Sequence, residues 1–326
     1  MNTYFIYLHF KISKSNFVFS GKFRNYFFKI LGDKLEIITV FKSKNDLDKL
    51  ANFSDSQDEI AKSEGFGLLL DVIALSTKLL VSNQSDGFVY SSTSQLLSDF
   101  HNDKKSFDEL NNELKKQKGY SCGLLGEWPI VIQEGASITL TSDSLDFYKY
   151  LLNHLISFTK YKNSHISLFN YWRKGLVLDE LWFTDESFLN YYKIIDYFLE
   201  KHRKNNGLIK KLLALFLKRK LELSEEDVRK TIQTLNLSPD KENIKLIFEF
   251  REIRNNGDIA HPSIKKTQGG SAVVKRGNLY SFSNYDNLWW YWDLIEEITR
   301  LFLLRHANLL DVKLVPDGGL LSLRKS

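Results

Sequence analysis

The first forty residues show the alternation of a β-sheet. Every second residue from Tyr4 to Ile12 is hydrophobic, and this period of two predicts a strand with a buried face. Two runs rich in β-branched and aromatic residues follow within 27–41. They flank Gly32-Asp33, a pair that is typical of a tight hairpin turn. We therefore expect a sheet at the start of the chain.

The region up to residue 143 also contains segments with the hydrophobic period of helices. The apolar side of one predicted helix, at 68–80, is expected to cover the sheet. In chain order, the expected elements are helices at Asp46–Leu50, Asp58–Leu80 and Phe107–Lys116, a short strand at Gly87–Ser91 and a second hairpin within Trp128–Leu140. This mixture predicts an N-terminal domain of strands and helices over residues 1–143. Its expected role is that of a sensor or regulator, and nothing in the sequence chooses between the two.

From Ser144 onward the hydrophobic pattern is almost wholly helical. Apolar residues recur at three- and four-residue steps, and Ser224 followed by three acidic residues is typical of a helix start. The expected helices are Asp146–Thr159, Phe169–Leu181, Glu186–His202, Leu208–Leu221, Ser224–Leu235, a helix from Ile244 to about Arg254, and Leu288–Leu310. Residues 144–326 are thus predicted to form an all-helical domain with a peripheral tail from Asp311. The fold class predicted for the whole chain is α+β.

The composition is that of a folded protein in a reducing compartment. Of 326 residues, 43% are hydrophobic and 14% are aromatic, which excludes a disordered chain and allows two cores. Cys122 is the only cysteine, so neither an intrachain disulfide nor a cysteine-based zinc site can form. The first residues do not have the pattern of a signal peptide, and the longest apolar run, Leu68–Leu80, is too short to cross a bilayer. We expect a cytoplasmic protein without a membrane partner.

The motif with the clearest chemistry is Arg-Asn-Asn-Gly-Asp-Ile-Ala-His at 254–261. The apolar stripe of the preceding helix, continued by one step from Phe250, is expected to reach Arg254, where a helix that faces the core would carry Leu or Ile. A cation there needs a partner or a ligand. The next residues, Asn-Asn-Gly, favour a helix end, and Pro262 favours an extended His261. Both side chains are therefore expected to reach one pocket.

An arginine and a histidine together suit the cleavage of RNA without a metal. The guanidinium binds phosphate and stays charged, and the imidazole exchanges a proton near neutral pH. A base can take the proton of the 2′-hydroxyl while a cation stabilises the charge that develops on the phosphate. One histidine does not easily take the proton of the attacking oxygen and also protonate the leaving oxygen. A two-fold dimer, which brings two copies of the residues together, is the economical solution. No phosphate loop, dinucleotide glycine pattern or metal-ligand cluster is found in residues 1–143. No cofactor and no metal are expected.

Arg254, Asn255 and His261 at the end of a helix resemble the signature of the HEPN superfamily of ribonucleases and nucleotide-binding helical domains. The resemblance covers the chain from about Ser144 onward, and Asp196 in FLNYYKIIDYFL (188–199) stands where the family often has an acidic residue. It implies a helical bundle that forms a homodimer and cleaves RNA to a 2′,3′-cyclic phosphate and a 5′-hydroxyl. Many members are toxins or effectors of prokaryotic defence against phage, so the resemblance also suggests a phage-derived trigger or a regulatory partner.

Basic residues near the motif are candidates for RNA binding. Net charge is +5, and residues 201–220 hold eight Lys and Arg and no Asp or Glu. A glycine-rich segment at 263–284 carries further cations. The residues expected to contact an RNA substrate, such as a tRNA or an mRNA, are Lys210, Lys211, Lys265, Lys266, Lys275 and Arg276. A charge run is more commonly a solvated face, and the segment at 263–284 is equally well explained as a surface excursion.

The motif also has purely structural interpretations. Arg254 would be favoured at a helix C-terminus by the helix dipole alone, and a lone loop histidine is commonly bonded to backbone. The leading hypothesis is a HEPN-type endoribonuclease in which Arg254 and His261 cut RNA and Asn255 orients the phosphate or the histidine. The alternative is a non-catalytic dimeric module that binds RNA, a nucleotide or a partner protein. A third hypothesis is an interaction subunit in which the spacing is accidental.

Overall fold

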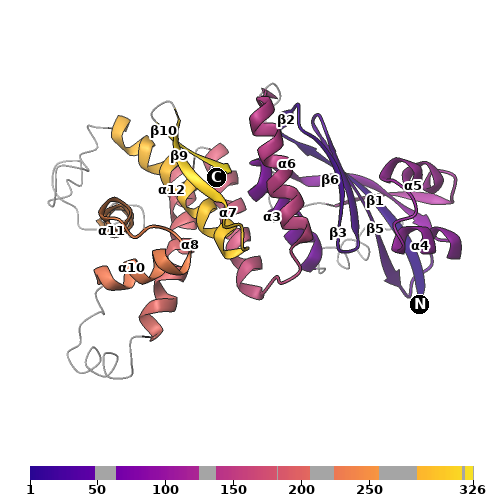
Figure 1. Ribbon diagram of the computed structural model, residues 1–326. Coiled ribbons are helices and arrows are strands. Elements are labelled where there is room, and N and C mark those ends of the chain that lie inside the picture. Colours follow the sequence, from indigo (N-terminus) through magenta and orange to yellow (C-terminus); the bar gives the residue numbers. More distant parts are fainter. Residues whose placement is uncertain are drawn as a thin grey trace, which may run out of the picture. The chain divides into compact units, whose positions relative to one another are not determined.

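The computed structural model describes residues 1–47, 64–124, 137–181, 183–205, 224–256, 285–317 and 320–325 (Figure 1). The chain forms two compact units, Met1–Lys160 and Tyr161–Ser326. The first unit contains a β-sheet with helices, and the second is mainly helical. The predicted α+β class is confirmed. Within the described ranges, no helix is both long and apolar enough to cross a membrane.

A six-stranded antiparallel sheet is the framework of the first unit. Its order is β3-β4-β5-β1-β6-β7, with β1 at Asn2–Ile12, β3 at Val18–Phe23, β4 at Tyr26–Leu31, β5 at Lys34–Ser43, β6 at Val81–Ser91 and β7 at Gly119–Leu124. Strand β1 pairs with β5 on one side and with β6 on the other. Two short strands, β2 (Lys14–Ser15) and β8 (Ser137–Ile138), pair in parallel elsewhere in the unit.

The local predictions for this sheet are confirmed, with one strand longer than expected. The alternating residues of β1 from Tyr4 to Ile12 are buried. The hairpin between β4 and β5 turns at Gly32, whose φ of +65° suits glycine at the first central position of a type II′ turn. The strand predicted at Gly87–Ser91 begins already at Val81, because β6 follows β1 along almost its whole length.

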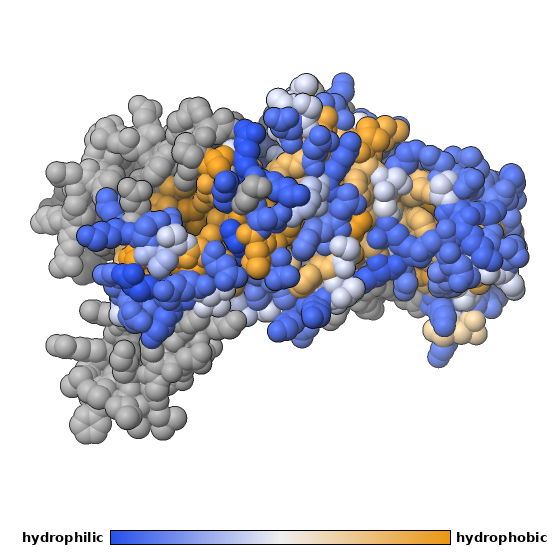
Figure 2. Space-filling model, viewed as in Figure 1, coloured by the Kyte–Doolittle hydropathy of each residue, from blue (hydrophilic) through white to orange (hydrophobic). Residues whose placement is uncertain are grey.

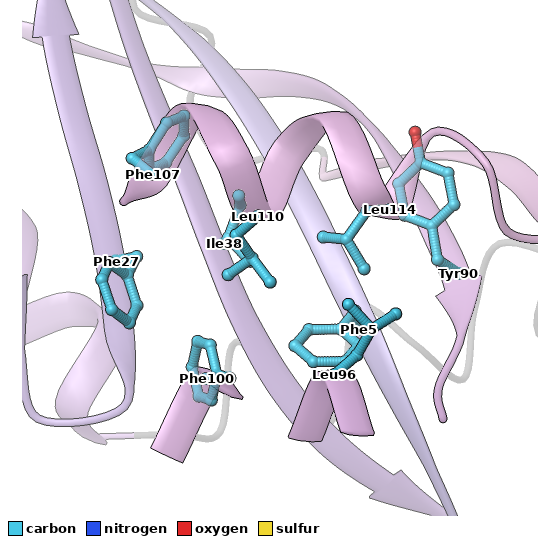
Figure 3. Packing of buried hydrophobic residues seen from close by; sticks show 9 residues of the cluster. All are labelled: Phe5, Phe27, Ile38, Tyr90, Leu96, Phe100, Phe107, Leu110 and Leu114. Carbon is cyan, nitrogen blue, oxygen red and sulfur yellow. The ribbon is translucent and has the colours of Figure 1, made fainter. Parts of the chain in front are cut away.

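Two short helices cover one face of the sheet (Figure 3). Helix α4 (Ser94–His101) and helix α5 (Phe107–Leu114) bury apolar residues against the strands. The cluster consists of Phe5, Phe27, Ile38 and Tyr90 from the strands with Leu96, Phe100, Phe107, Leu110 and Leu114 from the helices. Around these two helices the outer surface is mostly hydrophilic (Figure 2), as expected of amphipathic helices.

The opposite face of the sheet is covered by α3 (Glu64–Thr77) and α6 (Ser142–Ser157). Phe66 of α3 packs against Phe10 of β1, with ring centroids 5.7 Å apart. Helix α6 contacts both α3 and β3. The first unit therefore extends to Lys160, instead of ending at the predicted boundary of residue 143, because α6 belongs to this core.

Helix α8 is the centre of the second unit. It spans Thr184–Asn205 and contacts α7 (Asn163–Glu180), α10 (Glu225–Thr234), α11 (Lys241–Asn256) and α12 (Tyr285–His306). Aromatic rings fill the interfaces: Phe188 of α8 lies 6.2 Å from Phe250 of α11 and 5.4 Å from Trp292 of α12. At the start of α10, Ser224 caps the helix as the sequence suggested, and the side chain of Asp227 completes a capping box.

The tail of the chain differs from its prediction. The strands β9 (Val312–Asp317) and β10 (Leu320–Lys325) form an antiparallel hairpin that packs on α12. Val312 and Leu323 are buried, and the Arg305 guanidinium donates a hydrogen bond to the Val312 carbonyl at 2.7 Å. The second unit is therefore not all-helical, and the tail is part of its core.

Four predicted elements lie wholly or partly outside the described residues. They are the helix at 208–221, most of the hairpin within 128–140, most of the short helix at 46–50 and the first residues, 58–63, of the helix predicted at 58–80.

A glycine allows the close packing of α7 on α8. A Cβ atom on Gly175 would lie 2.5 Å from the ring of Tyr191, which is buried. We expect Gly175→Ala to lower the free energy of unfolding by about 1–3 kcal/mol, because the ring or the helix must move. The matched control is Gly67→Ala in α3, where a Cβ would meet nothing within 4 Å. This substitution should stabilise the helix by up to about 1 kcal/mol. Urea unfolding followed by circular dichroism measures both, and equal effects would contradict the prediction.

Candidate functional site

The apolar stripe of α11 ends beside Arg254 and does not include it. Ile244, Ile247, Phe250 and Ile253 are buried, whereas Arg254 is partly exposed. The prediction that the stripe continues to Arg254 is therefore wrong. Positions 253 and 254, three and four residues after Phe250, lie on either side of the centre of the same helix face. Ile253 occupies the buried position of the two. The arginine lies at the edge of the packed face.

The start of α11 follows from local sequence. Asp240 accepts a hydrogen bond from the backbone N–H of Asn243 at 2.7 Å, which caps the first turn. The described part of α11 reaches Asn256, two residues after Arg254, and Gly257, which was expected to end the helix, lies outside the described residues. The guanidinium thus stands in the last turn, where the helix dipole favours a cation. This agrees with the structural interpretation of Arg254 as well as with the functional one.

Arg254 lines a pocket between α11 and α8. The pocket has a volume of about 300 Å³ and is lined by Glu186, Leu189, Asn190, Tyr192, Lys193, Asp196 and Arg254. All the lining residues except Arg254 come from α8. The polar members recur at steps of three and four residues, which places them along one side of that helix. Every lining residue belongs to the second unit.

An aromatic ring supports the arginine at this pocket. The guanidinium carbon of Arg254 lies 5.7 Å from the ring centroid of Tyr192. Tyr192 is only 4% exposed and stacks against Phe188, so its position is fixed by the core. A cation over a tyrosine face is stabilised by roughly 0.5–2 kcal/mol. This contact holds the arginine beside α8.

The polar wall of α8 is ordered by hydrogen bonds. The Asn190 amide donates to the Glu186 carbonyl at 2.7 Å, and its oxygen accepts from the Lys193 ammonium at 3.3 Å. The same ammonium lies 5.0 Å from the ring centroid of Tyr171. Partial burial lowers the pKa of Lys193, and the nearby charge of Lys174 lowers it further.

The structure brings together two of the residues that the sequence singled out. Asp196 and Arg254 both line the pocket, although they are far apart in the chain. Asn255 lies in the last turn of α11, and its side chain is outside the described part. His261 and the predicted RNA-binding residues are also outside the described residues; the latter are Lys210, Lys211, Lys265, Lys266, Lys275 and Arg276.

Sequence reasoning did not find Glu186, Asn190, Lys193 and Tyr192 as site residues. A signal was present, because Asn190, Lys193 and Asp196 interrupt the apolar run of α8 at steps of three residues. Such a spacing indicates a polar stripe, and most polar stripes on helices simply face solvent. Only the packing of α11 against α8 shows that this stripe forms a pocket wall.

The pocket offers hydrogen-bonding groups, and its positive and negative charges are equal in number. It contains two carboxylates, from Glu186 and Asp196, and two cations, from Lys193 and Arg254. Arginine and lysine donors suit phosphate oxygens, whereas the carboxylates accept hydrogen bonds from amines or hydroxyls. Within the described ranges, no group of three or more His, Cys, Asp and Glu residues has a suitable arrangement for a metal ion.

The contact between Arg254 and Tyr192 can be measured as a coupling energy. In a double-mutant cycle of Arg254→Met and Tyr192→Leu, we expect the two changes to be non-additive by about 0.5–1 kcal/mol, since each removes the same cation–π contact. Urea unfolding of the wild type, the two single variants and the double variant gives the coupling. Additive effects would show that the ring does not hold the arginine.

Comparisons with known proteins supply no relative for this site. No protein-family model, curated protein or solved structure matches the chain. What is known of the site is therefore its own geometry: an arginine at the end of α11, placed over a tyrosine and facing the polar wall of α8.

Proposed function

We propose that this chain is a metal-independent endoribonuclease of the HEPN type, a toxin or effector that acts in the cytoplasm in prokaryotic defence against phage. One observation carries the proposal. Arg254 and Asp196, both singled out by the resemblance to that family, line one pocket although they come from different helices. Two residues can act on the same ligand only if they lie in the same site.

The proposed mechanism uses the residues of the motif in separate roles. His261 takes the proton of an RNA 2′-hydroxyl, and the resulting oxygen attacks the adjacent phosphorus. Arg254 stabilises the negative charge on the equatorial phosphate oxygens, and Asn255 orients the phosphate or the histidine. The products are a 2′,3′-cyclic phosphate and a 5′-hydroxyl. The protein works as a homodimer through its helical unit, and the N-terminal unit responds to a phage-derived trigger or a regulatory partner.

Cleavage in the absence of divalent metal tests this mechanism. The purified protein should cut RNA in EDTA and leave 2′,3′-cyclic phosphate ends. His261→Ala should lower the rate by about 10²–10⁴-fold, because the general base is lost. Arg254→Ala should lower it by about 10²–10³-fold, because the developing charge is no longer stabilised. End-group analysis of the RNA products and single-turnover rates are the measurements.

Matched variants separate the site from general damage. His101→Ala and Arg229→Ala, at the end of α4 and in α10, remove the same side-chain types outside the pocket and should keep the wild-type rate. Circular dichroism and sedimentation should show that all variants keep their fold and assembly. Cleavage that persists in His261→Ala would rule out the mechanism.

A second candidate function is supported by the charge of the pocket. Its two cations are matched by two carboxylates, and a pocket without excess positive charge attracts a polyanion less than an unopposed basic surface does. Among the ligands of the alternative hypothesis, which are RNA, a nucleotide and a partner protein, this balance favours a partner protein held by a non-catalytic dimeric module. In that case Arg254 binds a ligand and no bond is broken.

Expression in bacterial cells distinguishes the two candidates. If the chain is a nuclease toxin, its expression should arrest growth, and Arg254→Ala and His261→Ala should each relieve the arrest because each removes catalysis. Lys230→Ala, at an exposed position of α10, is the control and should still arrest growth. Growth curves and immunoblots of protein level are the measurements. Normal growth with abundant wild-type protein favours the binding module.

A further inference from the structure

Lys193 is the second cation of the pocket, and its position is set by its neighbours. It lies one helical turn from Asn190 and one turn from Asp196 on the same side of α8. The Asn190 amide is oriented by its hydrogen bond to the Glu186 carbonyl, so that the Asn190 oxygen faces the ammonium. An ammonium has three N–H donors, and in the described part of the structure Asn190 takes one of them.

The environment of Lys193 makes its proton easier to transfer. Partial burial lowers the pKa of the ammonium, and the charge of Lys174 lowers it further. Transfer to an oxygen becomes more favourable as the pKa of the donor falls toward the working pH. An arginine, the residue type of the other cation, is not a proton donor in proteins. The two cations of the pocket therefore suit different tasks.

We propose that Lys193 is the general acid that protonates the leaving 5′-oxygen during RNA cleavage. This inference rests on the function proposed above and adds a catalytic residue to it. In the step, the 2′-oxygen gives its proton to His261 and forms a bond to phosphorus. The bond from phosphorus to the 5′-oxygen breaks, and that oxygen receives a proton from the Lys193 ammonium. Afterwards the lysine regains a proton from water and the histidine releases one.

Two other groups of the pocket, Arg254 and Tyr192, are less suited to this step. Arg254 stabilises charge without giving up a proton. Tyr192 is almost fully buried beneath the guanidinium, which leaves its ring as the floor of the pocket. Lys193 is exposed, and its ammonium lies against the Asn190 oxygen and 5.0 Å from the ring centroid of Tyr171. With Lys193 as the acid, the base and the acid of the displacement are two different residues.

The test uses an RNA oligonucleotide with one cleavable linkage, made with either oxygen or sulfur as the leaving 5′-atom. A thiolate leaves readily without protonation, so the sulfur substrate does not need a general acid. Lys193→Arg keeps the positive charge but cannot donate a proton at neutral pH. We expect this variant to cut the oxygen substrate at least about 10²-fold more slowly than the wild type. On the sulfur substrate its rate should lie within about tenfold of the wild-type rate.

Two further measurements separate acid catalysis from phosphate binding. The wild-type rate on the oxygen substrate should fall at high pH as the lysine loses its proton, and this fall should disappear in Lys193→Arg. His261→Ala should be slow on both substrates, because it lacks the base. Lys230→Arg, a conservative change on α10 outside the pocket, should match the wild type on both.

The outcomes are distinct. If wild-type protein does not cut the oxygen substrate, the proposed function fails and the role of Lys193 fails with it. If the wild type cuts and Lys193→Arg cuts the oxygen substrate equally fast, the nuclease stands and Lys193 is not its acid. The same conclusion follows if Lys193→Arg is equally slow on both substrates, since the lysine would then act by binding and not by proton transfer.

Discussion

Helix α8 contacts every other described helix of the second unit, and the rest of that unit depends on this packing. Its apolar side supplies rings such as Phe188 and Phe198 to α11 and α12, while its polar side carries Asn190, Lys193 and Asp196. A helix surrounded on most sides leaves a narrow strip for polar residues. Those residues must therefore lie in a row, and the row becomes a pocket wall where the end of α11 meets it.

This arrangement gives Arg254 two kinds of stabilisation that are independent of any ligand. It stands in the last turn of α11, where the dipole favours positive charge, and it lies over the ring of Tyr192. A cation held in place before a substrate arrives loses little freedom on binding, which is the basis of preorganised charge stabilisation. A structural role and a catalytic role for this arginine are thus compatible.

The two units are built independently. The first closes its sheet between α4 and α5 on one face and α3 and α6 on the other. The second buries its own aromatic core, and the pocket is lined by residues of that unit alone. A chain with two separate cores can couple a nuclease to a regulatory unit without sharing side chains between them. The division of labour proposed for the protein requires only this.

The sequence alone determined the local structure. The period of two in β1, the glycine turn after β4 and the capping box of α10 all follow from neighbouring residues. Tertiary packing decided the rest. Helix α6 joined the first core, the tail folded onto α12 as a hairpin, Ile253 took the buried position expected of Arg254, and the polar stripe of α8 became a wall opposite that arginine. Periodicity states which side of an element is apolar, because it depends on residues three or four apart. It does not predict which distant element will cover that side, and the pocket exists only where the polar stripe of α8 meets Arg254 of α11.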